Sequence, residues 1–209
     1  MDEFVQDYET FGLGDVVLQG GATLRDAKLA YKTYGQLNAD KSNAIVYPTW
    51  YSGRHWDNEW LIGEGMALDP ANYFIIVPNL LGNGLSSSAS NTPPPYDKAR
   101  FPNVTFWDQV QQQHRLVTEK FGIETLPLVT GWSMGAGQTY QWAVSFPDMV
   151  QRACPFCGGK NTGYWIVGIE DRIRVSSPIV PFLIGTLKST RMKTRLPLRS
   201  TSVMLRGNA

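Results

Sequence analysis

Residues 131–135 (GWSMG) restrict the fold of this chain more than any other part of its sequence. They follow the apolar run 126–130 and precede a segment with helical spacing, so a serine flanked by glycines stands between a strand and a helix. Only small residues fit on both sides of such a tight turn, which raises the serine hydroxyl above the sheet. The pattern therefore predicts a parallel sheet with helices packed against it.

Ser133 is the predicted nucleophile, and backbone amides are the predicted donors beside it. A serine that attacks a carbonyl carbon creates an oxyanion, which N–H groups at a helix N-terminus stabilise. The amide of Met134 stands at that place in the sequence. The loop after the first buried strand is expected to supply a second donor, with the amides of Trp50 and Tyr51 as candidates. The alternative is that this aromatic loop only packs against the mouth of the site.

The other periodic segments predict an α/β fold with a mostly parallel sheet and helices on both of its faces. Residues 16–34 alternate partly around a glycine pair, which indicates an antiparallel hairpin. Thr105 is expected to cap one helix, and a second helix is expected over 134–146. The polar residues 83–103 predict a long loop. Short apolar runs are typical of buried parallel strands, and they occur at 43–49, 73–78 and 150–156.

Charge divides the 209 residues near position 159. Residues 1–159 carry 10 lysines and arginines against 16 acidic residues, whereas residues 160–209 carry 9 against 2. Such a change of sign is typical of a boundary between segments. We therefore expect a partial α/β domain over 1–159 and a basic extension of unclear fold over 160–209. The net charge of +1 argues against nucleic-acid binding through phosphates.

The sequence predicts no resident cofactor, no metal site and no membrane span. Cys154 and Cys157 fall on an expected buried strand, which favours structural cysteines over a redox pair or zinc ligands. The glycines of residues 82–84 lack the lysine of a P-loop. The acidic N-terminus does not resemble a secretory signal, no apolar run spans a membrane, and the C-terminus is not of the SKL type. A cytoplasmic protein is the expectation.

Three stretches of the sequence resemble the homoserine O-acetyltransferase-like branch of the α/β-hydrolases. They are GWSMG with the nearby GQTYQWAVSFPDMV, the loop NLLGNGLSSS, and the run NTPPPYDKARFPNVTFWDQVQQQHRLVTEKFGI. The resemblance covers about residues 10–159 and is strongest to fungal members. It implies an α/β-hydrolase fold with Ser133 as acyl-accepting nucleophile. It also implies ester hydrolysis, or acyl transfer from acyl-CoA as co-substrate to a hydroxyl; several fungal relatives serve secondary-metabolite or toxin pathways.

The base that this chemistry requires is absent from its expected place. In this fold the catalytic partners follow in the order serine, acid, histidine, but no histidine follows Ser133. The acids that follow it are Asp148, Glu170 and Asp171. His55 lies in the loop expected to border the site and is the candidate substitute base, with a pocket-wall or hydrogen-bonding role as the alternative. His114 lies within the first expected helix and is predicted to be structural.

Three functions follow as alternatives. The first is an ester hydrolase or acyltransferase that acts on a small-molecule ester or alcohol in a fungal secondary-metabolite or toxin pathway. The second is a catalytically inactive hydrolase that acts as a binding protein. The third is a non-functional fragment, which a frameshift or a splicing change would produce by rerouting the chain after residue 159. An open sheet edge is the predicted site of any oligomer contact.

Overall fold

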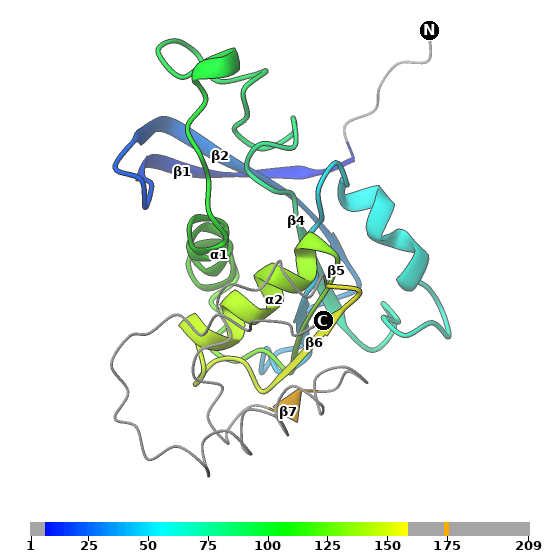
Figure 1. Ribbon diagram of the computed structural model, residues 1–209. Helices are drawn as coiled ribbons and strands as arrows, with labels where there is room; N and C mark the ends of the chain where they lie inside the picture. The colour runs from blue at the N-terminus through cyan, green and yellow to red at the C-terminus, as the bar shows by residue number, and fades with distance from the viewer. Residues whose placement is uncertain (1–6, 159–173, 176–209) are drawn as a thin grey trace, which may run out of the picture. The chain divides into compact units, whose positions relative to one another are not determined.

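The computed structural model describes residues 7–158 and 174–175, which contain a seven-stranded sheet. The strand order is β1-β2-β4-β3-β5-β6-β7 (Figure 1). The strands are β1 (Glu9–Val17), β2 (Thr23–Tyr34), β3 (Ala44–Val46), β4 (Phe74–Pro78), β5 (Leu128–Trp132), β6 (Arg152–Phe156) and β7 (Arg174–Val175). β2 pairs antiparallel with β1 and β4, and all other neighbours are parallel. This is the mostly parallel sheet that the sequence predicted.

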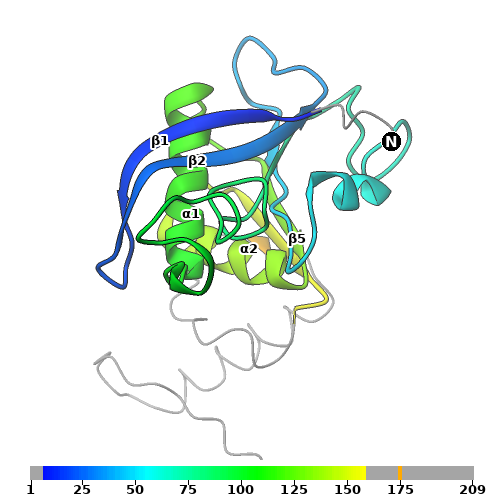
Figure 2. The same cartoon turned by 90° about the horizontal axis from the view of Figure 1, so that it is seen from above.

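Both α-helices of the described residues, α1 (Phe106–Arg115) and α2 (Met134–Ser145), pack on one face of the sheet (Figure 2). A π-helical turn, η3 (Leu116–Lys120), prolongs α1, and η2 (Lys98–Arg100) is a short 3-10 turn in the preceding loop. Along β3 and β4 the side chains alternate between the two faces. Val46 and Ile76 pack under the helices, whereas Ile45 and Ile75 point to the other face.

A 3-10 helix, η1 (His55–Leu61), and the chain after it lie against this second face. Leu61, Ile62 and Leu68 pack there against Ile45 and Ile75. The α/β class is therefore as predicted, and within the described residues the helix on the second face is a 3-10 helix in the segment predicted as a polar, aromatic loop. The segment that follows β3 is rich in aromatic and polar residues and has no run with helical spacing, so it forms only one short 3-10 helix.

β3 and β6 are shorter than the predicted runs 43–49 and 150–156, and β1 and β5 differ from their predicted bounds for local reasons. β1 already begins at Glu9, because register shifts around Gly14 interrupt the alternation from which the hairpin was predicted. Gly14 has a φ of 64°, a conformation that glycine adopts without strain. β5 begins at Leu128, two residues later than predicted, and Leu126 makes only an isolated bridge. Pro127 lies between them and has no amide to donate to a neighbouring strand.

Asp108 joins the start of α1 to the β1–β2 hairpin. Its carboxylate accepts hydrogen bonds from the amides of Thr105 (2.8 Å) and Gln19 (2.7 Å), while the Thr105 hydroxyl accepts from the Asp108 amide (3.2 Å). The Asp108 side chain is fully buried. The predicted cap at Thr105 is thus present, and its partner also holds the hairpin.

We expect Asp108→Ala to lower the free energy of unfolding by about 2–4 kcal/mol, because the buried carboxylate accepts two partly buried backbone hydrogen bonds and a hydrogen bond to a charged group contributes about 1.5–3 kcal/mol. The two donors are the amides of Gln19 and Thr105. Urea denaturation measures the loss. Glu124→Ala, which removes an exposed acid, is the control and should change stability by less than about 0.5 kcal/mol. Equal effects of the two substitutions would show that Asp108 does not hold the hairpin.

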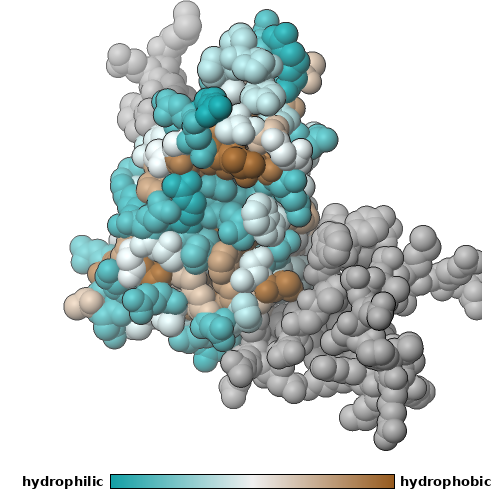
Figure 3. Space-filling model, turned by 90° about the vertical axis from the view of Figure 1, so that its left-hand side faces the viewer, coloured by the Kyte–Doolittle hydropathy of each residue, from teal (hydrophilic) through white to brown (hydrophobic). Residues whose placement is uncertain are grey.

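The structure tests only some of the expectations about the two ends of the chain. No helix within residues 7–158 and 174–175 is long and apolar enough to cross a membrane. The predicted boundary at 159, with Glu170 and Asp171, lies outside the described residues. From the predicted extension, Arg174–Val175 pair with β6 and add a strand beside it. On the face shown in Figure 3, hydrophobic residues form patches between hydrophilic ones.

Candidate active site

Ser133 stands on the turn between β5 and α2 in a conformation that few residues with a side chain adopt. Its φ is 53° and its ψ is −115°. Its amide donates to the Phe156 carbonyl (3.1 Å), and its carbonyl accepts from the Ala136 amide (3.0 Å). The end of β6 and the first turn of α2 therefore both hold the turn. Strain of this kind persists only where the surrounding structure imposes it, and it is concentrated at functional sites.

Three glycines around this turn have no room for a side chain. A Cβ on Gly131 would lie 2.2 Å from the carbonyl oxygen of Gly135. A Cβ on Gly135 would lie 2.8 Å from the carbonyl oxygen of Pro48, and one on Gly137 would lie 2.5 Å from the Phe106 ring. The tight strand–turn–helix unit predicted from the sequence is present, and the start of α2 also packs directly against the chain after β3.

The hydroxyl of Ser133 is available to a reacting group. Its side chain is half-buried, and it makes no capping bond to α2. Met134 is the first residue of α2. Its amide therefore has no carbonyl four residues earlier in the helix to which it could donate. A hydroxyl that does not cap the helix and a helix-terminal N–H thus lie on adjacent residues, an arrangement suited to a reaction that forms an oxyanion.

The loop of residues 49–53, which is predicted to supply a second oxyanion donor and is called the donor loop below, lies beside the turn. The rings of Trp50 and Trp132 meet edge to face with centroids 4.8 Å apart. The loop closes with a hydrogen bond from the Gly53 amide to the Trp50 carbonyl (3.0 Å). Tyr51 lies within this turn and its side chain is 77% exposed. The structure therefore brings Trp50 and Tyr51 to the end of the sheet that carries Ser133, and Trp50 also packs there as the alternative expected.

His55 has both ring nitrogens engaged elsewhere. The backbone amide of His55 donates to Asn79 Oδ1 (3.1 Å), so the Asn79 amide nitrogen faces His55 Nδ1 (3.2 Å) and must donate to it. The proton of the neutral ring is then on Nε2, which donates to a carboxylate oxygen of Asp7 (2.9 Å). His55 is fully buried. These contacts support the hydrogen-bonding alternative, and they offer Ser133 no proton acceptor.

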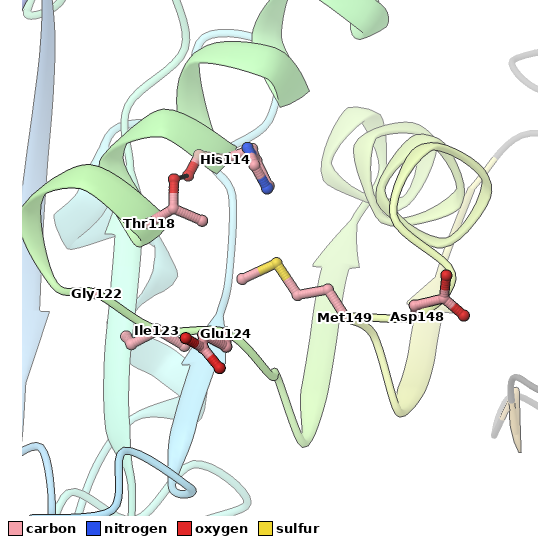
Figure 4. A pocket seen from close by; sticks show the side chains of 7 residues that line it. All are labelled: His114, Thr118, Gly122, Ile123, Glu124, Asp148 and Met149. Carbon is pink, nitrogen blue, oxygen red and sulfur yellow. Dashed lines mark hydrogen bonds between the residues drawn. The ribbon is translucent and has the colours of Figure 1, made fainter.

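His114 lies at the other end of the layer. Its ring stacks on Phe146 with centroids 3.9 Å apart, and burial lowers its pKa, which favours a neutral ring. It borders a hollow of about 450 Å³ at the amino end of β5 (Figure 4). The other residues that line this hollow are Thr118, Gly122, Ile123, Glu124, Asp148 and Met149. Ligands of open parallel sheets bind at the carboxyl ends of the strands, where Ser133 stands, so the hollow is separate from the site.

The two cysteines differ from the prediction that both are buried. Cys154 lies on β6 and is half-buried, whereas Cys157 is exposed. β6 ends at Phe156, and Cys157 has a φ of 51° in the turn after it. The expected strand, 150–156, ends at the same residue as β6, so Cys157 lies just beyond both. Among the described residues, no group of three histidine, cysteine or acidic side chains is placed to hold a metal ion.

The glycine-rich loop after β4 uses its amides internally. The Gly82 amide donates to the Ser87 carbonyl (2.9 Å), and the Gly84 amide donates to the Ser88 hydroxyl (2.8 Å). An anion-binding loop needs such N–H groups turned toward the ligand. These two amides therefore stabilise the loop itself and are not turned toward a ligand.

Buried glutamines near the site escaped prediction from the sequence. Gln109 exchanges hydrogen bonds with both backbone groups of Leu81 (2.9 Å each), and Gln113 and Gln138 bond to each other (2.6 Å). The apolar spacing of α1 did not indicate that these amides face inward. The available signal is that Gln109 and Gln113 share a helix face with Leu116, at spacings of four and three residues.

The fold and the serine turn together define a protein class. The pattern of the alpha/beta hydrolase fold family matches residues 49–157, which hold the donor loop, Ser133 and the end of β6. The chain belongs to this family. Among curated relatives, an ethyl acetate hydrolase from Pseudomonas veronii is 53% identical over 185 residues, or 88% of this chain and 53% of that protein.

Two further relatives extend the comparison. A homoserine O-acetyltransferase from Methanococcoides burtonii is 41% identical over 160 residues, covering 67% of this chain and 32% of that protein. A crystal structure of the acetyl esterase MekB superposes with a TM-score of 0.71 at 53% identity, over 73% of this chain and 44% of that one. The chain spans about half the length of curated relatives that are more than 50% identical to it. These relatives support the esterase and acetyltransferase likeness, whereas the predicted affinity to fungal members is not shown by them.

Proposed function

We propose that Ser133 is the nucleophile of an ester-hydrolysing or acyl-transferring site, with the amides of Met134 and of Tyr51 or Trp50 as oxyanion donors. The observation that carries this proposal is the strained Ser133 turn, whose hydroxyl makes no capping bond to α2. An ethyl acetate hydrolase and an acetyl esterase among the relatives favour a small ester with a short acyl group as substrate. The homoserine O-acetyltransferase supports acyl transfer, for which acyl-CoA is the expected co-substrate.

The proposed reaction follows from the placement of these groups. The Ser133 oxygen attacks the ester carbonyl carbon, and the carbonyl oxygen gains negative charge beside the Met134 amide. Collapse of this intermediate expels the alcohol and leaves the acyl group on Ser133, from which water or a second alcohol removes it. The serine proton needs a base, which contributes about 10²–10⁴-fold to such reactions. Neither histidine of the chain is placed to accept it, so we expect slow turnover.

A second candidate function rests on the same Ser133 turn, taken together with the placement of the two histidines. With His55 bonded at both ring nitrogens and His114 at the other end of β5, the described residues retain the turn and the donor loop without a base. A hydrolase-like binding protein without turnover, or a non-functional fragment, has these features.

A fluorophosphonate probe, which reacts with activated serines, separates the alternatives. We expect slow labelling at Ser133, located by mass spectrometry, and its complete loss in Ser133→Ala. Ser145→Ala, which removes a hydroxyl at the far end of α2, is the matched control and should label at the native rate. A folded, unlabelled monomer favours the binding protein, and broad, uncooperative unfolding favours the fragment.

The fungal pathway, the cytoplasmic location, the oligomer contact and the rerouted reading frame stay predictions. The last has a direct test, which is to translate the flanking genomic DNA in all frames. A continuation that carries the family's acid and histidine supports rerouting, and its absence removes the main argument for it.

A further inference from the structure

Thr49 is held at three of its atoms where the donor loop leaves β3. It is fully buried. Its amide donates to the Pro78 carbonyl (3.2 Å), and its hydroxyl accepts from the Leu80 amide (3.1 Å). Its carbonyl accepts from Gln138 Nε2 (2.9 Å). The first two partners belong to the end of β4 and the loop after it, but the third belongs to α2, the helix that begins directly after Ser133.

A row of buried side chains fixes which end of the Gln138 amide faces Thr49. The indole N–H of Trp142 is a donor only, and it donates to Gln113 Oε1 (2.8 Å). Gln113 therefore turns its nitrogen toward Gln138, whose Oε1 accepts (2.6 Å). Gln138 is left with its nitrogen toward Thr49. All three side chains are 0% exposed, so water does not compete for these bonds.

The bond to Thr49 also sets the direction of the next amide. The Thr49 carbonyl and the Trp50 N–H belong to one planar trans peptide group, in which they point in opposite directions. A donor fixed on the carbonyl therefore points the Trp50 N–H away from Gln138. The same Gln138 nitrogen lies 3.4 Å from the Met134 carbonyl, so one side chain contacts both peptide segments that carry the proposed donors.

We propose that Gln138 is a positioning residue, which holds the Thr49–Trp50 peptide so that the donor loop faces the hydroxyl of Ser133. Gln113 and Trp142 orient it. The proposal rests on the proposed function of Ser133, because an orientation matters to a reaction only where an oxyanion forms. It also makes a statement about the loop itself that is measurable without any reaction.

Gln138→Met tests the proposal because methionine has a similar length and no donor. Gln141→Met is the matched control: Gln141 lies on the same helix, is half-buried, and donates to the Ser145 hydroxyl at the helix end (2.8 Å). The first readout is the rate of Ser133 phosphonylation as a function of probe concentration. We expect the maximal rate to fall about 10- to 100-fold in Gln138→Met, since loss of one oxyanion donor costs about 10²–10³-fold. The concentration that gives half the maximal rate should stay unchanged.

The second readout is hydrogen exchange of the Thr49 and Gly53 amides, both of which are bonded in this loop. We expect faster exchange there in Gln138→Met and native exchange in the strands. Native labelling and native loop exchange in a folded Gln138→Met would overturn the proposal. If the native protein itself is not labelled, the proposed function fails, and loop exchange alone then decides on the positioning role.

Gln138→Glu keeps the test informative if the methionine variant does not fold. An ionised carboxylate still accepts from Gln113 but cannot donate to Thr49, whereas a protonated carboxyl can. We therefore expect the maximal labelling rate, relative to the native protein at the same pH, to recover as the pH falls and the introduced carboxyl is protonated. If the ratio of the two maximal labelling rates does not change with pH, Gln138 does not act by donating a hydrogen bond to Thr49.

Discussion

Gly131→Ala is expected to lower the free energy of unfolding by at least about 3 kcal/mol, at the upper end of what overpacking costs. The added Cβ would meet the carbonyl oxygen of Gly135 at 2.2 Å, its carbonyl carbon at 2.3 Å and the Thr139 hydroxyl at 2.8 Å. Two of these atoms are backbone, so no rotation of a side chain relieves the clash. Either β5 or α2 has to move, and Ser133 moves with it. A thermal melt should show a drop of roughly 6–12 °C.

Gly20→Ala is the control for this substitution. A Cβ on Gly20 would have no atom within 4 Å, and its φ lies outside the left-handed region. We expect its stability to stay within about 0.5 kcal/mol of the native protein. If both variants melt together with the native protein, the close approach of Gly131 to Gly135 is wrong.

Added imidazole is expected to accelerate ester hydrolysis by the 209-residue chain about tenfold or more. The Ser133 hydroxyl is half-buried on its turn, and neither His55 nor His114 is placed to take its proton. A small base from solution then supplies part of the missing general-base catalysis. Release of nitrophenol from a short-chain ester measures the rate.

The controls separate this rescue from catalysis by imidazole itself. Ser133→Ala measures the background, and only the excess over it counts. Only neutral imidazole accepts a proton, so the acceleration should disappear below about pH 5, well under the usual pKa of an imidazole ring. If Ser133 is labelled by the probe but imidazole gives no excess rate, the lack of a base does not limit this chain.

The sheet and the serine turn were predictable because their determinants are local. Short apolar runs mark the buried parallel strands, partial alternation marks the hairpin, and the glycine spacing of residues 131–135 marks the turn, without reference to distant parts of the chain. The register shifts around Gly14 were not predictable from alternation, because a bulge changes the pairing of one strand relative to another. The position of β3 between β4 and β5 likewise depends on which strands pair with each other, and sequence periodicity does not determine that.

The surroundings of the site depend on distant contacts, and the sequence predicted them less well. His55 lies in the expected loop, but its ring is fixed by Asn79, 24 positions away, and by Asp7, 48 positions away. Gln138 and Thr49 are 89 positions apart. No local pattern indicates such partners, so the sequence offers His55 as a candidate base and does not single out Gln138.

The irregular register of β1 also affects how copies of the chain meet in concentrated solution. β1 is an edge strand, and an unbroken edge is a template on which another strand can add and begin aggregation. The two register shifts near Gly14 space the outward N–H and C=O groups unevenly, so a second strand cannot continue the ladder across them. The hairpin that completes the sheet thus also discourages its growth at that edge.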